Sequence, residues 1–211
     1  MSELTFYTHP MSRGRVVRWM LEEVGASYEV KAMEFGPAMK GRDYLAINPM
    51  GKVPAIKHGN TVVTEVAAIC AYLADQFPDK ELAPPPQSPE RGTYYRWLFF
   101  MAGPFEMATS AKAYGWNIDS SNEQSVGCGP VDASLRTLEQ ALSKTPYVCG
   151  EQFTAADVLV SSYLWWEMTQ ENIPKLEVFQ TYVDGMESRP AAKRANTLDD
   201  ELAEKMKPVS G

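Results

Sequence analysis

The sequence predicts an α/β domain over residues 1–77, followed by an all-helical domain over residues 90–211. Segments in which apolar and polar residues alternate, a pattern typical of strands, occur only in the first of these regions. Residues 78–89 contain five prolines, which cannot continue a helix, so this segment is predicted to be an extended linker. Beyond the linker, the longer segments have helical character.

The first region begins with a strand, a helix and a second strand. The segment "ELTFYT" alternates, and apolar residues at helical spacing then lead to Gly25, a common helix stop. The segment "SYEVKAMEF" alternates again. Because a helical crossover joins the two strands, we expect them to pair in parallel.

A hairpin and a second helix complete this region. The segment "KVPAIKHGNTVVTE" predicts two short antiparallel strands joined around Gly59 and Asn60. The segment "EVAAICAYLADQFP" predicts a helix that ends at Pro78. The order βαβ-ββα therefore predicts a mixed sheet in a domain of thioredoxin-like order.

The second region contains four segments of helical character and one long loop. The loop is predicted over residues 115–130, which include three glycines. The helical segments are "ERGTYYRWLFFMAGPFEMATSAKAY", "PVDASLRTLEQALSK", "TAADVLVSSYLWWEMTQ" and "PKLEVFQTYVDGMESR".

The composition argues against several classes of protein. A net charge of −7 without a block of Lys or Arg argues against a nucleic-acid partner. There is no secretory leader at the N-terminus and no apolar run of membrane-spanning length, so we expect a cytoplasmic protein without membrane attachment. Three cysteines without a CxxC pair, together with only two histidines, indicate neither a disulfide framework nor a metal site.

The segment "YTHPMSRGR" joins the first strand to the first helix and places Ser12 where the helix begins. Serine is a favoured N-cap, because its oxygen accepts a free backbone N–H. The same helix end carries partial positive charge, which attracts anions. From these residues alone, a structural cap and an anion-binding hydroxyl both remain open. The cationic residues Arg13, Arg15 and Arg18 are equally compatible with a solvated helix face and with an anion pocket.

Two further motifs stand at element boundaries. In "NPMGKVPAI", a cis bond before Pro54 would turn the backbone of Val53 toward a ligand, although a trans bond is the ordinary form. In "FTAADV", Thr154 and Asp157 have the spacing of a capping box, and Phe153 could act as a hydrophobic staple. We assign this second motif to folding.

Over essentially its whole length, the chain resembles the cytosolic glutathione transferases. The order of an α/β half, a proline-rich linker and a helical half is the order of that family. The segments "PMSRGR", "NPMGKVPAI", "TEVAAICAYL" and "FTAADV" carry the resemblance, and their combination is more specific than any one of them.

The resemblance implies a glutathione-binding site in the first domain. It implies that the bond before Pro54 is cis and that the backbone of Val53 pairs with the cysteinyl part of glutathione, beside Lys52. It assigns the γ-glutamyl end to Glu65 and to the backbone N–H of Val66. Family members have a serine after the acidic residue, and Val66 departs from that pattern.

The resemblance also bears on Ser12. In the serine- and cysteine-using branches the active residue lies at the strand-to-helix junction, where this chain has Ser12 and no cysteine. In the tyrosine-using branches the position of the tyrosine corresponds to His9, and Tyr7 lies two residues upstream. We therefore expect Ser12 to be the catalytic residue of a bacterial-type, serine-using member, with Tyr7 and backbone amides as alternatives.

The expected function is conjugation of the glutathione thiolate to small apolar electrophiles, as in detoxification, with glutathione as cosubstrate and without metal. Met11, Met107 and Tyr114 are candidates for an electrophile pocket between the domains. The alternative is a glutathione-binding stress or ligand-carrier protein with little catalysis. A disulfide reductase is disfavoured, because such exchange needs a protein thiol. Relatives of this family form homodimers, so the resemblance also implies a homodimer.

Overall fold

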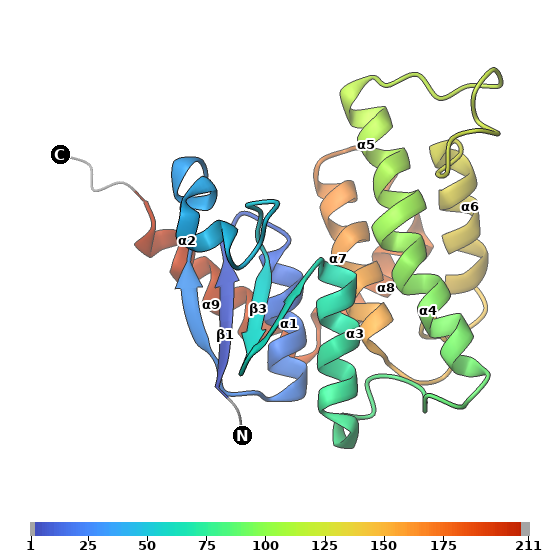
Figure 1. The fold of residues 1–211 in the computed structure, drawn as a ribbon. Coiled ribbons are helices and arrows are strands. Elements are labelled where there is room, and N and C mark those ends of the chain that lie inside the picture. Colours follow the sequence, from blue (N-terminus) through green and yellow to red (C-terminus); the bar gives the residue numbers. More distant parts are fainter. Residues whose placement is uncertain (1–2, 208–211) are drawn as a thin grey trace. The chain divides into compact units, whose positions relative to one another are not determined.

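The computed structural model describes residues 3–207, whose contacts divide the chain into two compact units. Within this range, the first unit holds residues 3–80 and 189–207, and the second holds Glu81–Ser188. Figure 1 shows a sheet and its helices in the first unit and a set of helices in the second.

The first unit is built on a four-stranded mixed sheet, as the sequence predicts. In the sheet order β2-β1-β3-β4, β1 is parallel to β2 and antiparallel to β3, and β3 and β4 form the predicted hairpin. The strands are β1 Leu4–Thr8, β2 Glu29–Ala32, β3 Ala55–His58 and β4 Thr61–Thr64. The alternating segment "SYEVKAMEF" forms a strand over four residues only, and all four are exposed.

Helices cover this sheet. The α-helices are α1 Gly14–Val24, α2 Arg42–Leu45, α3 Val66–Gln76 and α9 Pro190–Lys205, and the 3-10 helices are η1 Pro37–Lys40 and η2 Pro78–Lys80. Helix α1 packs against both α3 and α9 (Figure 1). The predicted stop at Gly25 ends α1 in a left-handed conformation with φ 65°, which glycine adopts without a Cβ penalty.

Alternation along β1 decides which side chains face α1. Phe6 and Thr8 are fully buried, and Thr8 lies against Gly14 of α1. Tyr7 points to the opposite face of the strand. There its ring lies 5.7 Å from the ring of Tyr44 in α2.

The second unit is all helical. Its α-helices are α4 Glu90–Phe100, α5 Glu106–Tyr114, α6 Val131–Leu142, α7 Ala155–Thr169 and α8 Glu177–Glu187. A π-helical segment, η3 Met101–Phe105, joins α4 to α5 at Pro104, whose missing N–H interrupts the regular α-helical ladder. Helix α7 packs against α4 and α8. Within residues 3–207 no helix combines the length and the apolar character of a membrane span.

The last helix, α9, departs from the division expected from sequence. That division placed all of residues 90–211 in one helical domain, whereas the contacts place α9 in the first unit, along α1. None of the four segments predicted to be helical includes α9, and helical periodicity would not reveal which neighbour the buried face of a helix contacts.

Candidate functional site

The turn that connects β1 to α1 is held by hydrogen bonds around Ser12. Its hydroxyl donates to the carbonyl oxygen of His9 at 2.7 Å and accepts the backbone N–H of Gly14 at 2.9 Å. Its backbone N–H also donates to the His9 carbonyl, at 3.1 Å. Ser12 thus organises the first turn, although it is not a standard N-cap, because Arg13 occupies that position.

Gly14 allows β1 to lie close to this turn. A Cβ at this position would lie 2.0 Å from Oγ1 of Thr8 and 3.0 Å from Oγ of Ser12. Since Thr8 is fully buried, a larger residue would force the strand and the turn apart. The glycine of "SRGR" therefore sets the distance between the central strand and Ser12.

His9 is fixed in one neutral form by the same turn. Its Nδ1 accepts the backbone N–H of Met11 at 3.0 Å, which places the ring proton on Nε2. The ring stacks on Phe35, with centroids 3.8 Å apart. Partial burial lowers the pKa of His9 below 6.5, and the carboxylate of Glu34 opposes this shift.

The loop before β3 is held by side chains that the sequence reading did not single out. The carbonyl of Lys52 accepts the hydroxyl of Tyr44 at 2.7 Å and the amide of Asn48 at 2.8 Å. Burial raises the pKa of Tyr44 to about 12, so its hydroxyl stays a donor at neutral pH. Lys40 donates to the carbonyls of Met50 and Gly51 at 2.8 and 3.1 Å.

The residues that follow this loop have the predicted backbone form. The Val53–Pro54 peptide bond is cis, as the resemblance implied. Val53 is half-buried, and within residues 3–207 its backbone N–H has no hydrogen-bond partner in the protein. This N–H is available to an extended ligand.

The start of α3 has no side-chain cap and no acidic residue within its first turn. Glu65, the residue before the helix, is exposed and adopts φ 66° and ψ 123°, a conformation that non-glycine residues rarely take. Such strained positions concentrate at functional sites. Val66 is buried, so only its backbone can serve a ligand there.

Strand register brings these three segments to one end of the sheet. Tyr7 in β1 pairs with Ala55 in β3, and Ala55 pairs with Thr64 in β4. Consequently the end of β1, which leads to Ser12, lies beside the start of β3 and the end of β4. The predicted residues Ser12, Val53–Pro54 and Glu65–Val66 therefore share one end of the sheet.

The predicted electrophile-pocket residues lie in both units. Met11 belongs to the first unit, whereas Met107 and Tyr114 belong to the second, on α5. Their exposed fractions are 62%, 48% and 75%, which are high for apolar side chains.

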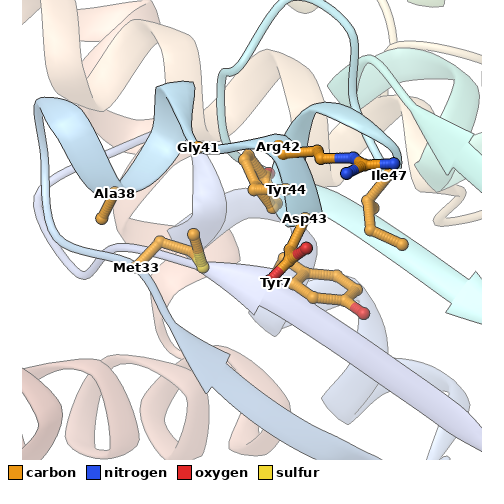
Figure 2. Close-up of a pocket in the computed structure, with 8 residues that line it drawn as sticks. All are labelled: Tyr7, Met33, Ala38, Gly41, Arg42, Asp43, Tyr44 and Ile47. Atoms are coloured by element: carbon orange, nitrogen blue, oxygen red, sulfur yellow. The ribbon is translucent and has the colours of Figure 1, made fainter.

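A pocket of about 440 Å³ that does not include the predicted glutathione-site residues is lined in part by Tyr7, on the face of β1 that points away from α1 (Figure 2). Tyr7 and Tyr44 belong to its wall, and none of the predicted glutathione-site residues does. Its lining residues are Tyr7, Met33, Ala38, Gly41, Arg42, Asp43, Tyr44 and Ile47. The position of Tyr7 in this wall weakens the alternative that Tyr7 acts in place of Ser12.

Sequence reasoning missed the residues that shape the site from outside the motifs. Lys40, Tyr44 and Asn48 hold the loop before β3. The Asn-Pro pair at 48–49 is a turn signal that points to Asn48. Nothing in the sequence pattern identifies Lys40 or Tyr44. Within residues 3–207 no group of three His, Cys, Asp or Glu side chains is arranged to bind a metal.

Comparison with known proteins gives concordant matches. Residues 2–75 match the family model described as glutathione S-transferase, N-terminal domain, and residues 123–166 match the model of the C-terminal domain. Glutathione S-transferase GstA of Escherichia coli O157:H7 is 30% identical over 158 residues, which cover 74% of this chain and 77% of that protein.

Solved structures agree with these matches. A glutathione transferase from Methylococcus capsulatus superposes with a TM-score of 0.79 at 26% identity, covering 94% of this chain and 99% of that one. The glutathione transferase URE2P6 from Phanerochaete chrysosporium, solved in complex with oxidized glutathione, superposes with a TM-score of 0.76 at 25% identity and covers 95% of this chain and 98% of its own.

Proposed function

Because this chain belongs to the glutathione S-transferase family, we propose that it transfers the thiolate of glutathione to small apolar electrophiles, with Ser12 as the residue that stabilises the thiolate. The family assignment confirms the predicted fold and the predicted kind of enzyme. We further propose that the chain is a serine-using, bacterial-type member that acts in the cytoplasm in detoxification.

The observation that carries this proposal is the place of the Ser12 hydroxyl. It lies at the start of an eleven-residue helix whose first turn has no acidic residue, so the positive end of that helix is not compensated locally. Its Oγ accepts the N–H of Gly14, which fixes the oxygen without using the hydroxyl proton.

The hydroxyl proton now points to the carbonyl of His9, and it must turn away to reach a sulfur. After that rotation the His9 carbonyl still accepts the backbone N–H of Ser12, so its oxygen is not left without a hydrogen-bond donor. The exchange replaces a neutral hydrogen bond of about 0.5–1.5 kcal/mol by one to a charged acceptor of about 1.5–3 kcal/mol. Thiolate binding therefore favours the rotation.

These magnitudes set the size of the expected pKa shift. The thiol of a free cysteine has a pKa of about 8.5, and each unit by which it is lowered requires about 1.4 kcal/mol of preferential thiolate stabilisation. The hydroxyl bond to the thiolate contributes about 1.5–3 kcal/mol, but the bond to His9 that it replaces takes back about 0.5–1.5 kcal/mol, and the helix end adds about 0.3–1 kcal/mol. Central values of these ranges leave a net stabilisation of about 1.9 kcal/mol, which lowers the thiol pKa by about 1.4 units.

We propose that the backbone of Val53, beside Lys52 and Pro54, pairs with the cysteinyl part of glutathione. The unpartnered N–H of Val53 supports this role. We propose that Glu65 and the N–H of Val66 bind the γ-glutamyl end, a role supported by the uncapped start of α3. Met11, Met107 and Tyr114 are proposed to contact the electrophile, since their exposed apolar surface favours apolar compounds.

We also propose a two-fold homodimer. Exposed aromatic side chains on α4 support it: Tyr95 is 41% exposed and Phe99 is 71% exposed, with ring centroids 6.5 Å apart. Sedimentation equilibrium at micromolar concentration should give twice the monomer mass, and a species of 23.5 kDa would contradict the proposal.

Two observations favour the alternative of a glutathione-binding protein with little catalysis. Val66 replaces the family's serine, and the proton of Ser12 is donated within the protein. Turnover of a chloronitroarene with glutathione, measured beside a calorimetric titration of glutathione, separates the two functions. Binding without turnover would favour the alternative.

Replacement of Ser12 by alanine tests the catalytic role. We expect Ser12→Ala to raise the pKa of the bound thiol and to lower kcat/KM at neutral pH by about 10- to 150-fold, the equivalent of 1.5–3 kcal/mol. A purely structural Ser12 would instead cost about 0.5–2 kcal/mol of stability, with activity per folded molecule nearly unchanged. Full activity with an unshifted thiol pKa would refute the assignment.

A further inference from the structure

Helix α9 is joined to α1 by several ion pairs between residues far apart in sequence. Arg18 and Asp199 form a buried pair at 2.7 Å. Arg194 of α9 contacts Glu22 of α1 at 3.2 Å, and Arg189, just before α9, contacts Glu23 at 2.7 Å. Some of these residues have further partners: Arg18 lies over the ring of Phe6 in β1, and Tyr28 donates its hydroxyl to Glu22.

The pair of Arg15 with Asp200 differs, because Arg15 also reaches the turn that holds Ser12. Its Nη2 contacts Oδ1 of Asp200 at 2.7 Å, and its Nε donates to the carbonyl oxygen of Pro10 at 2.7 Å. Pro10 lies between His9, whose carbonyl accepts the Ser12 hydroxyl, and Met11, whose N–H is held by the His9 ring. One guanidinium thus connects α9 to the backbone of the turn.

We propose that Asp200 is a positioning residue: it holds the guanidinium of Arg15 on the Pro10 carbonyl and thereby fixes the turn that places the Ser12 oxygen within reach of the thiolate. The inference rests on the proposed function of Ser12. Arginine suits this task, because its planar fork donates in two fixed directions at once.

The structure separates this role from stability. The side chain of Asp200 is 68% exposed, and exposed ion pairs contribute little to folding. The buried pair of Arg18 with Asp199, one residue away, secures the same two helices. Removal of the Asp200 carboxylate should therefore leave α9 in place while freeing Arg15 from one of its two partners.

The direction in which the pKa of the bound thiol shifts distinguishes a positioning role of Asp200 from a direct effect of its negative charge. Asp200 is negative, so its removal alone would stabilise a nearby thiolate and lower the pKa of the bound thiol. Loss of the oriented hydroxyl would raise that pKa. A raised pKa after removal of a negative charge therefore indicates positioning.

The test compares Asp200→Ala with Arg194→Ala, which removes an exposed ion pair between the same helices without a link to the turn. The pH dependence of the thiolate absorbance of bound glutathione gives the thiol pKa, and steady-state turnover gives kcat and KM. We expect Asp200→Ala to raise the thiol pKa and to lower kcat/KM about two- to fivefold at neutral pH, while Arg194→Ala matches the wild type. Asp200→Glu should restore part of the activity.

Failure of the positioning role and failure of the proposed function give different results. If Asp200→Ala matches Arg194→Ala, or lowers the thiol pKa, while the wild type forms thiolate and turns over, the positioning role is wrong and the proposed function stands. If the wild type shows neither a thiolate absorbance nor turnover, the proposed function fails and the inference fails with it.

Discussion

The starts of α7 and α1 both depend on a hydroxyl side chain, but they use it differently. At α7, Asp157 accepts the backbone N–H of Thr154 at 2.8 Å and its hydroxyl at 3.0 Å, within a capping box. The carboxylate also accepts the N–H of Val148 and the hydroxyl of Tyr182, both at 2.7 Å. The protein's own anion fills this helix start.

Among residues 3–207 no carboxylate takes that place at α1. In this described part of the chain, Ser12 bonds only to neutral groups of its own turn, and the first turn of α1 has no acidic residue. The start of α3 is similar in that the carboxylate of its N-cap residue, Glu65, makes no capping hydrogen bond and the first turn of the helix contains no acidic residue. A helix start that the protein supplies with an anion serves the fold, whereas one left without an anion can receive a ligand.

The largest effect is expected at Asp157. Asp157→Ala leaves the N–H groups of Val148 and Thr154 and the hydroxyl of Tyr182 buried and unpaired, at about 1–3 kcal/mol each, so we expect a stability loss of at least about 3 kcal/mol. Urea unfolding measures it as a lower midpoint. Activity per folded molecule should not change.

Asp157→Asn is the matched variant, because the amide keeps one acceptor oxygen and should lose less stability than the alanine. A loss of glutathione turnover per folded molecule in either variant would break the comparison, since it would give the start of α7 a role in the site.

The next effect concerns Glu65 at the start of α3. Glu65→Gly removes a backbone strain of about 1–3 kcal/mol and adds about 0.5–1 kcal/mol of chain entropy cost, so stability should stay the same or rise. If Glu65 binds the ammonium end of glutathione, loss of a charged hydrogen bond should raise the dissociation constant of glutathione about 10- to 150-fold.

Glu171→Gly is the control, because Glu171 also has a positive φ, 58°, but lies just after α7. Calorimetric titration should show unchanged glutathione affinity for this variant. Equal affinities for both variants would mean that the strain at Glu65 serves no ligand.

The same comparison shows what sequence could and could not predict. Local rules sufficed for the capping box, because Thr154 and Asp157 lie three residues apart, and for the hairpin at Gly59. Register then follows from alternation. The packing of α9 on α1 was not predictable, since its ion pairs join residues more than 160 positions apart and no local pattern links Arg15 to Asp200.

Residue type alone was also insufficient at Ser12. The sequence left a cap and an anion-binding hydroxyl open, and the hydrogen bonds show that the side chain serves its own turn, with its proton donated to the His9 carbonyl. Whether that proton reaches a thiolate depends on a ligand, which is why Ser12→Ala is needed.

The smallest effect is the pH dependence that His9 gives to the α1 turn. His9 has a lowered pKa in the folded protein, chiefly from partial burial, so between its folded value and about 6.5 the unfolded chain binds more protons. Stability therefore falls as pH drops through about 6.5, and the loss stops growing below the folded pKa. Protonation also places a donor on Nδ1, opposite the N–H of Met11.

Urea unfolding of the wild type and of His9→Gln between pH 5 and 8 isolates this contribution, because glutamine does not titrate and its carbonyl can accept the N–H of Met11. We expect the wild type to lose more stability than the variant on acidification. This difference should be smaller than the free-energy changes expected for Asp157→Ala and Glu65→Gly. The Thr154 turn contains no histidine, so a Thr154→Ser variant should follow the wild-type pH profile. If the stability of the wild type and of His9→Gln depended on pH in the same way, titration of His9 would not contribute to the stability of the protein.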